Sequence, residues 1–348
     1  MRSYRLLSSS ASHLVLVGLL IAVAPLCTAT RVQAQILPSL GGERAGTSGF
    51  QFLKIPVDAR STALGNSVVA SANDASVLFW NPALAAQLTG TQIGLYQTAY
   101  VVDVTLSMAA AVFKLKNTGI TIGGSIQAMD SGEMNVTTEF QPFGTGETFS
   151  LTDVAVGLTF SQALTDLFSY GITTKYIRES VIGVTATTIA FDLGVFYRIG
   201  STGAQMAVAI RNFGFDAKPT GTIDRKVIAA NPTRTESEFE RIETPTTFHL
   251  SFMYELLRSD SANSLQLSAE LSNPSDNAEN VNVGAEYGWN QLLMFRLGYR
   301  FGIEEFQLPG IGIGIRIPLA GKYFRFDYGF SELERLGTIH RFGFNLFL

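Results

Sequence analysis

The stretch Tyr323-Phe324-Arg325-Phe326-Asp327-Tyr328-Gly329-Phe330 decides the fold of this chain. From Phe324 onward, aromatic residues stand at every second position, and the positions between them hold arginine, aspartate and glycine. Successive side chains of a β-strand point to opposite faces, so this period of two predicts a strand with one apolar and one polar face. The same alternation recurs through the C-terminal part of the chain, at 248–255, 265–271, 281–287, 295–301 and 311–317.

The composition restricts the class of protein to which these strands belong. The chain has 348 residues, of which only 16% are charged, with 33 glycines, 25 phenylalanines and a mean hydropathy of +0.21. Typical soluble domains have about 25% charged residues. Disordered chains, coiled coils and nucleic-acid-binding arms need more charge or fewer aromatic residues, so the composition excludes them. A membrane protein or an unusually apolar β protein remains.

Residues 1–34 have the features of a secretory signal peptide. Arg2 and Arg5 precede the apolar run Leu14–Leu26, and Val32-Gln33-Ala34 predicts cleavage between Ala34 and Gln35. An uncleaved anchor or a lipoprotein cysteine is the alternative. The single cysteine, Cys27, leaves with the signal, which excludes disulfides and thiol chemistry in the mature protein. The acidic net charge of −4 gives no electrostatic surface for nucleic acid.

An exported chain of this composition needs a way to satisfy its backbone. No run after residue 34 reaches the roughly 18 consecutive apolar residues that indicate a membrane-spanning helix. A closed β-barrel pairs every backbone group internally, so we expect a transmembrane antiparallel barrel in the bacterial outer membrane. A water-soluble β-sandwich would alternate in the same way, because the pattern does not say which face is the outer one.

The barrel is expected to span residues 92–348 with about fourteen strands. Each run has about the length that crosses a bilayer at a tilt, and short and long connections alternate, as periplasmic turns and extracellular loops do. The runs are 92–101, 104–115, 119–128, 150–162, 169–179, 184–198, 204–213, 245–257, 264–272, 280–288, 292–301, 309–317, 322–330 and 338–348. The even count places both ends of the barrel on the periplasmic side.

Residues 35–91 do not show strand periodicity. A short helix is expected from Asp58 to Leu64, closed by Gly65. Asn73 or Asp74 would cap a second helix through Trp80, which Pro82 interrupts. A compact segment of small residues ahead of a barrel suggests a hatch inserted in the lumen, and a periplasmic extension is the alternative.

Motifs in this segment resemble the opening signature of the PorV/PorQ family, within the FadL-like class of outer-membrane barrels. The motifs are Phe52-Leu53-Lys54-Ile55, Asp58-Ala59-Arg60, Ala63-Leu64-Gly65, Ala72-Asn73-Asp74-Ala75 and Trp80-Asn81-Pro82-Ala83, and the resemblance continues to about residue 213. It implies a fourteen-stranded barrel with an N-terminal hatch, and a role in type IX secretion in which cargo proteins are carried or received at the outer membrane. The hatch motif residues are Asp58, Arg60, Asn73, Asp74, Trp80, Asn81, Pro82 and Ala83.

No enzyme signature and no cofactor motif appears. His249 could serve as a metal ligand or base, but a hydrogen-bonded polar residue of the lumen is the better interpretation. Charged residues gather on the polar face of the C-terminal strands. They predict either a salt-bridged plug that fixes the hatch, or a charged path or anionic head-group site. The lumen candidates are His249, Glu255, Glu270, Glu286, Arg296, Arg300, Arg316, Arg325, Asp327 and Arg341.

Two functions follow as hypotheses. The first is a non-enzymatic component of type IX secretion that binds cargo through extracellular loops, above all the charged loop 214–244. Its partners would be outer-membrane lipid, secretion components and secreted proteins. The second is a FadL-like passive channel for a hydrophobic or amphipathic small molecule. A purely supporting role for other assemblies is a third reading.

Overall fold

The computed structural model describes residues 46–116, 118–226, 233–236, 238–257, 260, 262–303, 305–319 and 321–348. The expected signal peptide, its cleavage site, Cys27 and the first part of the expected hatch segment therefore lie outside the described residues. Within the described part, no helix is long and apolar enough to cross a membrane.

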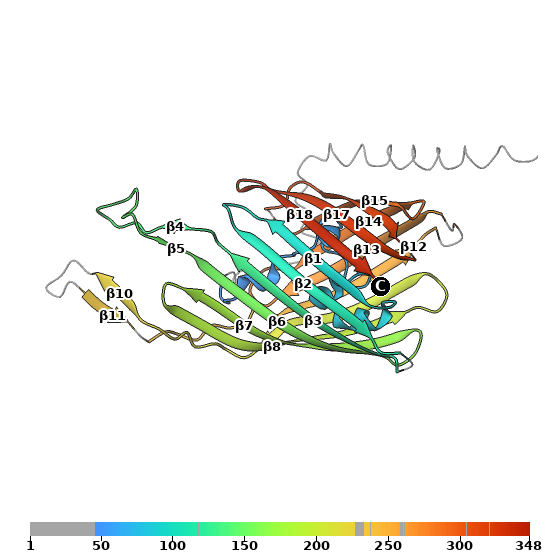
Figure 1. The fold of residues 1–348 in the computed structure, drawn as a ribbon, viewed down its shortest axis with the longest axis horizontal. Coiled ribbons are helices and arrows are strands. Elements are labelled where there is room, and N and C mark those ends of the chain that lie inside the picture. The colour runs from blue at the N-terminus through green and yellow to red at the C-terminus, as the bar shows by residue number, and fades with distance from the viewer. Residues whose placement is uncertain are drawn as a thin grey trace, which may run out of the picture. The chain divides into compact units, whose positions relative to one another are not determined.

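Fourteen antiparallel strands close into a single barrel, which confirms the predicted fold and strand number (Figure 1). Going around the wall, the order is β1-β18-β17-β16-β15-β14-β13-β12-β9-β8-β7-β6-β3-β2. The wall strands are β1 Gln92–Ala99, β2 Thr105–Lys114, β3 Ile120–Asp130, β6 Leu151–Ala163, β7 Phe168–Val181, β8 Val184–Arg198, β9 Ala204–Gly214, β12 Thr247–Glu255, β13 Ser264–Pro274, β14 Asn280–Trp289, β15 Leu293–Phe301, β16 Gly310–Leu319, β17 Lys322–Leu333 and β18 Gly337–Phe347.

The apolar face of each strand is the outer one. In β17, Phe326 is 42% exposed on the outside, whereas Arg325 and Asp327 are 2% and 1% exposed on the inside. The neighbouring strands β15 and β16 repeat this arrangement, with Phe295, Leu297, Ile311 and Ile313 exposed. An apolar outer surface and a polar interior are the arrangement of a membrane barrel, and they exclude the soluble sandwich.

The long connections carry two additional hairpins that the alternation of residues did not predict. They are β4 Met134–Asn135 with β5 Thr148–Phe149, and β10 Ile223–Lys226 with β11 Thr233–Glu236. Both hairpins lie at the same end of the barrel in Figure 1. Because long connections of such barrels are extracellular, we refer to this end as the outer end.

Short helices make up the N-terminal segment. They are η3 Gln51–Lys54, α2 Ala59–Ala63, α3 Val77–Trp80 and η4 Pro82–Gln87. Asp58 caps α2, accepting a hydrogen bond from the Ser61 amide at 2.8 Å, and the chain leaves this turn through Gly65, whose φ is +63°.

The expected cap of the second helix was wrong. Ser76, not Asn73 or Asp74, occupies the N-cap position of α3, and its side chain makes no capping bond. Asp74 instead accepts the Ser76 amide at 2.8 Å from outside the helix. Pro82 ends α3 but also begins η4, where a proline at the first position costs no hydrogen bond, and Asn81 caps this turn.

The N-terminal segment runs through the lumen from the outer end to the periplasmic end. At its start, the Gly49 amide donates to Glu243 O in a long connection at 3.0 Å. At its end, Lys114 Nζ donates to Ala86 O and Leu88 O, both at 3.0 Å, beside the short turn after β2. The first strand of the barrel begins on the periplasmic side, whereas the described part of this segment begins at the outer end.

Candidate functional site

Glycines on the inner wall let the backbone of the N-terminal segment touch the strands. An added Cβ at Gly298 of β15 would stand 2.1 Å from both Leu64 C and Gly65 N. An added Cβ at Gly194 of β8 would stand 2.0 Å from Asn81 Oδ1. A side chain at either position would therefore collide with α2 or with the Asn-Pro-Ala motif. These two glycines thus permit the close contact between the segment and the wall.

The Asn81-Pro82-Ala83 motif joins the segment to itself and to the wall. Asn81 Nδ2 donates to Val69 O at 3.0 Å, and its Oδ1 accepts the Ala83 amide at 3.0 Å. Ser169 Oγ of β7 donates to Ala83 O at 2.8 Å. The side chain of Asn81 is fully buried, so each of these polar groups needs its partner inside the protein.

A chain of buried ion pairs connects the segment to strands β14, β15 and β17. Arg60 of α2 binds Glu286 in a bidentate manner, with Nε–Oε2 at 2.9 Å and Nη2–Oε1 at 3.0 Å. Arg296 bridges Glu286, at 2.5 Å, and Asp327, at 2.7 Å. Arg325 binds Asp327 at 2.8 Å and also contacts Asp74 of the segment. Cations and carboxylates alternate along this cluster, which we call the lumen ion network.

Asp58 joins α2 to α3. Its Oδ1 accepts the indole N–H of Trp80 at 2.7 Å, while Oδ2 accepts from Ser61. Arg211 of β9 lies over the rings of Phe79 and Trp80, at 4.0 and 5.2 Å from their centroids. Sequence reasoning missed Arg211, because a single arginine at the end of an alternating strand carries no signal of its aromatic partners.

His249 lies on the inner face, where its Nδ1 is 2.9 Å from Glu270 Oε1. Glu270 Oε2 in turn accepts the Val69 amide at 3.2 Å. No group of three metal-ligating side chains occurs in the part of the chain that the structure describes. His249 and Glu270 therefore form another contact of the wall with the segment.

The remaining lumen candidates lie apart from the network. Arg316 is half-buried with its guanidinium carbon 4.6 Å from the Tyr323 ring centroid, and Glu255 is half-buried at the periplasmic end of β12. Arg300 and Arg341 are buried toward the outer end of the lumen. Asn73, a residue of the hatch motif, is exposed but contacts the network, since it accepts a hydrogen bond from Arg325 Nη1 at 2.8 Å.

At the outer end the segment is tied to the connection after β13. Both carboxylate oxygens of Asp276 accept a hydrogen bond from Lys54 Nζ, each at 2.8 Å. Asp276 also contacts Ser48 and Gln51. Burial alone raises the pKa of the Asp276 carboxyl, but the hydrogen bonds from these three residues outweigh burial and lower the pKa below its ordinary value.

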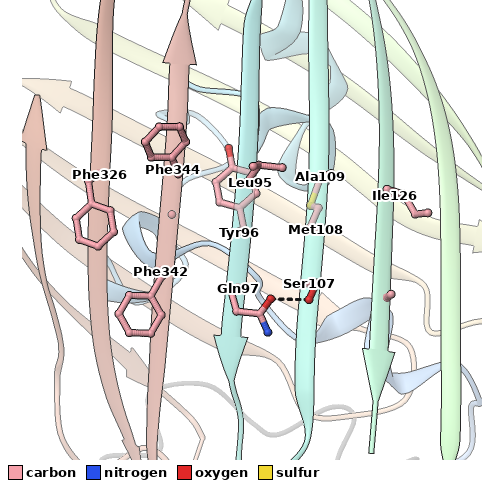
Figure 2. Close-up of a pocket in the computed structure, with 12 residues that line it drawn as sticks. Leu95, Tyr96, Gln97, Ser107, Met108, Ala109, Ile126, Phe326, Phe342 and Phe344 are labelled. Carbon is pink, nitrogen blue, oxygen red and sulfur yellow. Dashed lines mark hydrogen bonds between the residues drawn. The ribbon is translucent and has the colours of Figure 1, made fainter. Parts of the chain in front are cut away.

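The outer surface of the wall holds a groove of about 440 Å³ that faces the membrane (Figure 2). The groove is lined by Phe326 of β17 and by Phe342 and Phe344 of β18. Its lining also includes Ala109 of β2, which has a small side chain. Ser107 Oγ donates to Gln97 Oε1 at 2.6 Å within it, as Figure 2 shows. Its lining holds no charged side chain, so the groove suits a hydrocarbon chain and not a polar substrate.

The structure also exposes two aromatic side chains that sequence reasoning missed. Phe140 and Phe143, in the connection between β4 and β5, are 81% and 98% exposed. The whole connection from β3 to β6, residues 131–150, carries three glutamates and no lysine or arginine. The signal was present as two phenylalanines outside any alternating run, in a stretch otherwise rich in threonine, glycine and glutamate.

Together the fold and the occupied lumen define an outer-membrane β-barrel of FadL-like architecture. The family model described as type IX secretion system protein PorV matches residues 40–224, and the chain belongs to that family. It is thus an outer-membrane protein of a type IX secretion family, and this family is not one of enzymes. No curated protein sequence matches the chain.

Solved structures agree on the fold. The toluene transporter TodX of Pseudomonas putida matches with a TM-score of 0.55 at 13% identity, covering 83% of this chain and 96% of that one. The toluene transporter TbuX of Ralstonia pickettii matches with a TM-score of 0.54 at 13% identity, covering 86% and 98%. The monoaromatic hydrocarbon channel CymD matches with 0.54 at 12% identity, covering 83% and 96%. At this identity the similarity is one of fold.

Proposed function

We propose that this protein binds secreted cargo proteins through its outer connections. The observation that carries the proposal is the pair Phe140 and Phe143, which stand almost fully in solvent beyond the membrane-spanning strands. Exposed aromatic side chains are the usual anchors of protein interfaces. The glutamates that flank them, Glu139 and Glu147, favour a cargo surface with an apolar pocket and a basic rim.

A second feature supports docking at this end: backbone hydrogen bonds fix the connection between β9 and β12. Ala217 and Ile242 exchange two backbone hydrogen bonds of 2.9 Å, which closes the base of the connection between β9 and β12. Thr185 and Thr220 exchange two more of 2.8 Å, which ties this connection to the β7–β8 hairpin. A braced surface loses less conformational entropy when a partner binds.

We expect the double substitution Phe140→Ser and Phe143→Ser to weaken cargo binding by about 30-fold or more, since an interface anchor contributes about 2 kcal/mol or more. The measurement is the amount of cargo that co-purifies with the barrel and remains attached to intact cells. The control is Leu164→Ser with Leu167→Ser, which removes two exposed apolar side chains from a periplasmic turn. Equal cargo attachment in both double variants would sink the proposal.

A second candidate function is passive uptake of a small hydrophobic molecule. The observation that favours it is the fold shared with the toluene transporters TodX and TbuX. The lumen of this chain is occupied by a packed cluster that includes Val68, Leu78, Trp80 and Leu84 of the N-terminal segment. Uptake would therefore require the segment to move.

A disulfide lock separates the two functions. Ser67 Oγ of the segment and Ser268 Oγ of β13 are 2.7 Å apart, so the pair Ser67→Cys and Ser268→Cys is positioned for a crosslink, and no other cysteine remains after residue 34. For a cargo-binding protein, oxidation leaves cargo attachment unchanged. Uptake of a labelled aromatic hydrocarbon that stops on oxidation and returns on reduction would instead establish the channel. Ser67→Cys alone is the matched control.

A further inference from the structure

Two arginines at the outer end of the lumen differ from those of the lumen ion network. Arg300 of β15 and Arg341 of β18 are 9% and 1% exposed. Among the described residues, no carboxylate lies within 4.0 Å of either guanidinium, whereas Arg60, Arg296 and Arg325 each bind at least one. The two groups also repel each other electrostatically. Asp58 attracts Arg341 and Tyr100 attracts both arginines, but neither forms an ion pair with them, so this end of the lumen keeps an excess of positive charge that an anion would compensate.

A small cavity lies beside Arg300. It is lined by Thr62 of α2, Arg300, Phe306 and Ser331 of β17, together with Gly65, Gly298, Leu308 and Gly310. Arg341 Nη1 donates to Ser331 Oγ at 3.0 Å, which leaves the hydroxyl hydrogen of Ser331 free to donate elsewhere.

The cavity offers donors and positive charge. Arg300 has five N–H donors, and no side chain or carbonyl of the described part accepts from them. Its guanidinium carbon lies 3.7 Å from the ring centroid of Phe306, which covers it from the connection between β15 and β16. No carboxylate is among the described residues that line it. Such a site selects an anion.

The size of the cavity selects among anions. Its volume of about 10 Å³ is small, which favours a monatomic anion over a phosphate or a carboxylate. We propose that it binds a single halide ion, chloride under natural conditions, between Arg300 and the hydroxyl of Ser331.

The ion would also hold the N-terminal segment. Thr62 belongs to α2, and Arg341 Nε donates to Pro56 O of the segment at 3.0 Å. A halide shared by Arg300 and, through Ser331, by Arg341 joins these contacts to β15, β17 and β18. The ion would neutralise arginines at the outer end of the lumen, as Glu286 and Asp327 neutralise arginines in the lumen ion network.

The test uses the full mature protein, purified in a non-ionic detergent and transferred to sodium gluconate. Sodium chloride or sodium bromide is then titrated at constant ionic strength, and the thermal unfolding midpoint is followed by tryptophan fluorescence. A ligand that binds only the folded state raises this midpoint, so we expect a saturable rise of a few degrees. Arg300→Gln abolishes the rise, and the control Arg316→Gln, a half-buried arginine elsewhere, retains it.

Two further measurements keep the proposal falsifiable if Arg300→Gln does not fold. Ser331→Ala removes one donor, and the halide concentration at half-effect is then expected to increase several-fold. Crystals grown in bromide should show an anomalous scattering peak between Arg300 and Ser331. A midpoint that responds equally to gluconate and chloride would overturn the proposal, as would a wild-type halide response in Ser331→Ala or a water in place of bromide.

Discussion

Replacing Arg296 by methionine is expected to lower the free energy of unfolding by about 3–5 kcal/mol, the usual cost of removing one partner from a buried ion pair. Arg296 is the middle cation of the lumen ion network and touches both Glu286 and Asp327. Without it, two buried carboxylates share Arg60 and Arg325 alone, and their mutual repulsion is no longer screened. The measurement is urea unfolding in detergent, followed by tryptophan fluorescence and by the gel shift of the folded barrel.

Arg316→Met is the matched control, because Arg316 lies on β16, next to β15, and the substitution makes the same change in charge and shape. Its guanidinium lies over Tyr323, a contact worth about 0.5–1 kcal/mol. We therefore expect a loss several times smaller than for Arg296. Comparable losses in the two variants would show that the network does not carry this stability.

The second large effect is expected from adding one methyl group to the inner wall. In Gly298→Ala the new Cβ would stand 2.1 Å from the backbone of Leu64 and Gly65, so α2 has to leave its place or the wall has to bend. Overpacking of this kind costs about 1–3 kcal/mol or more. We expect trypsin to cleave after Lys54 or Arg60 at least ten times faster than in the wild type, while the strands stay resistant.

Gly124→Ala is the control for this experiment, since an added Cβ at Gly124 of β3 meets nothing within 4 Å. The rate of cleavage in this variant should equal that of the wild type. If Gly298→Ala also kept the wild-type rate, the close contact between α2 and β15 would be refuted.

The strands were predictable because their signal is local. Alternation within ten residues, as in 323–330, is caused by the pleat of a single strand and needs no knowledge of its neighbours. The observed ends differ from the expected ones by at most three residues, for example in β17, which continues to Leu333. The small hairpins were missed because strands of two to four residues are too short to show a period.

The partners of the charged residues were not predictable. Arg60 and Glu286 are separated by 226 positions, and Arg325 and Asp74 by 251. Nothing in the chain marks Arg296 as a network member and Arg300 as a cation without a carboxylate, although both occupy the inner face of β15. Which arginine meets a carboxylate depends on the register between strands and on where the segment lies in the lumen.

The chain alone determined that it forms about fourteen strands, that the charged residues of each strand share a face, and that residues before the barrel form short helices. These properties follow from local periodicity and from backbone preferences. Only the tertiary structure decided that the charged face is the inner one and that the segment enters at the outer end. It also decided which wall glycines the segment touches. Closure of the sheet decides these matters, since it turns one face of every strand toward a common interior and brings residues hundreds of positions apart into contact.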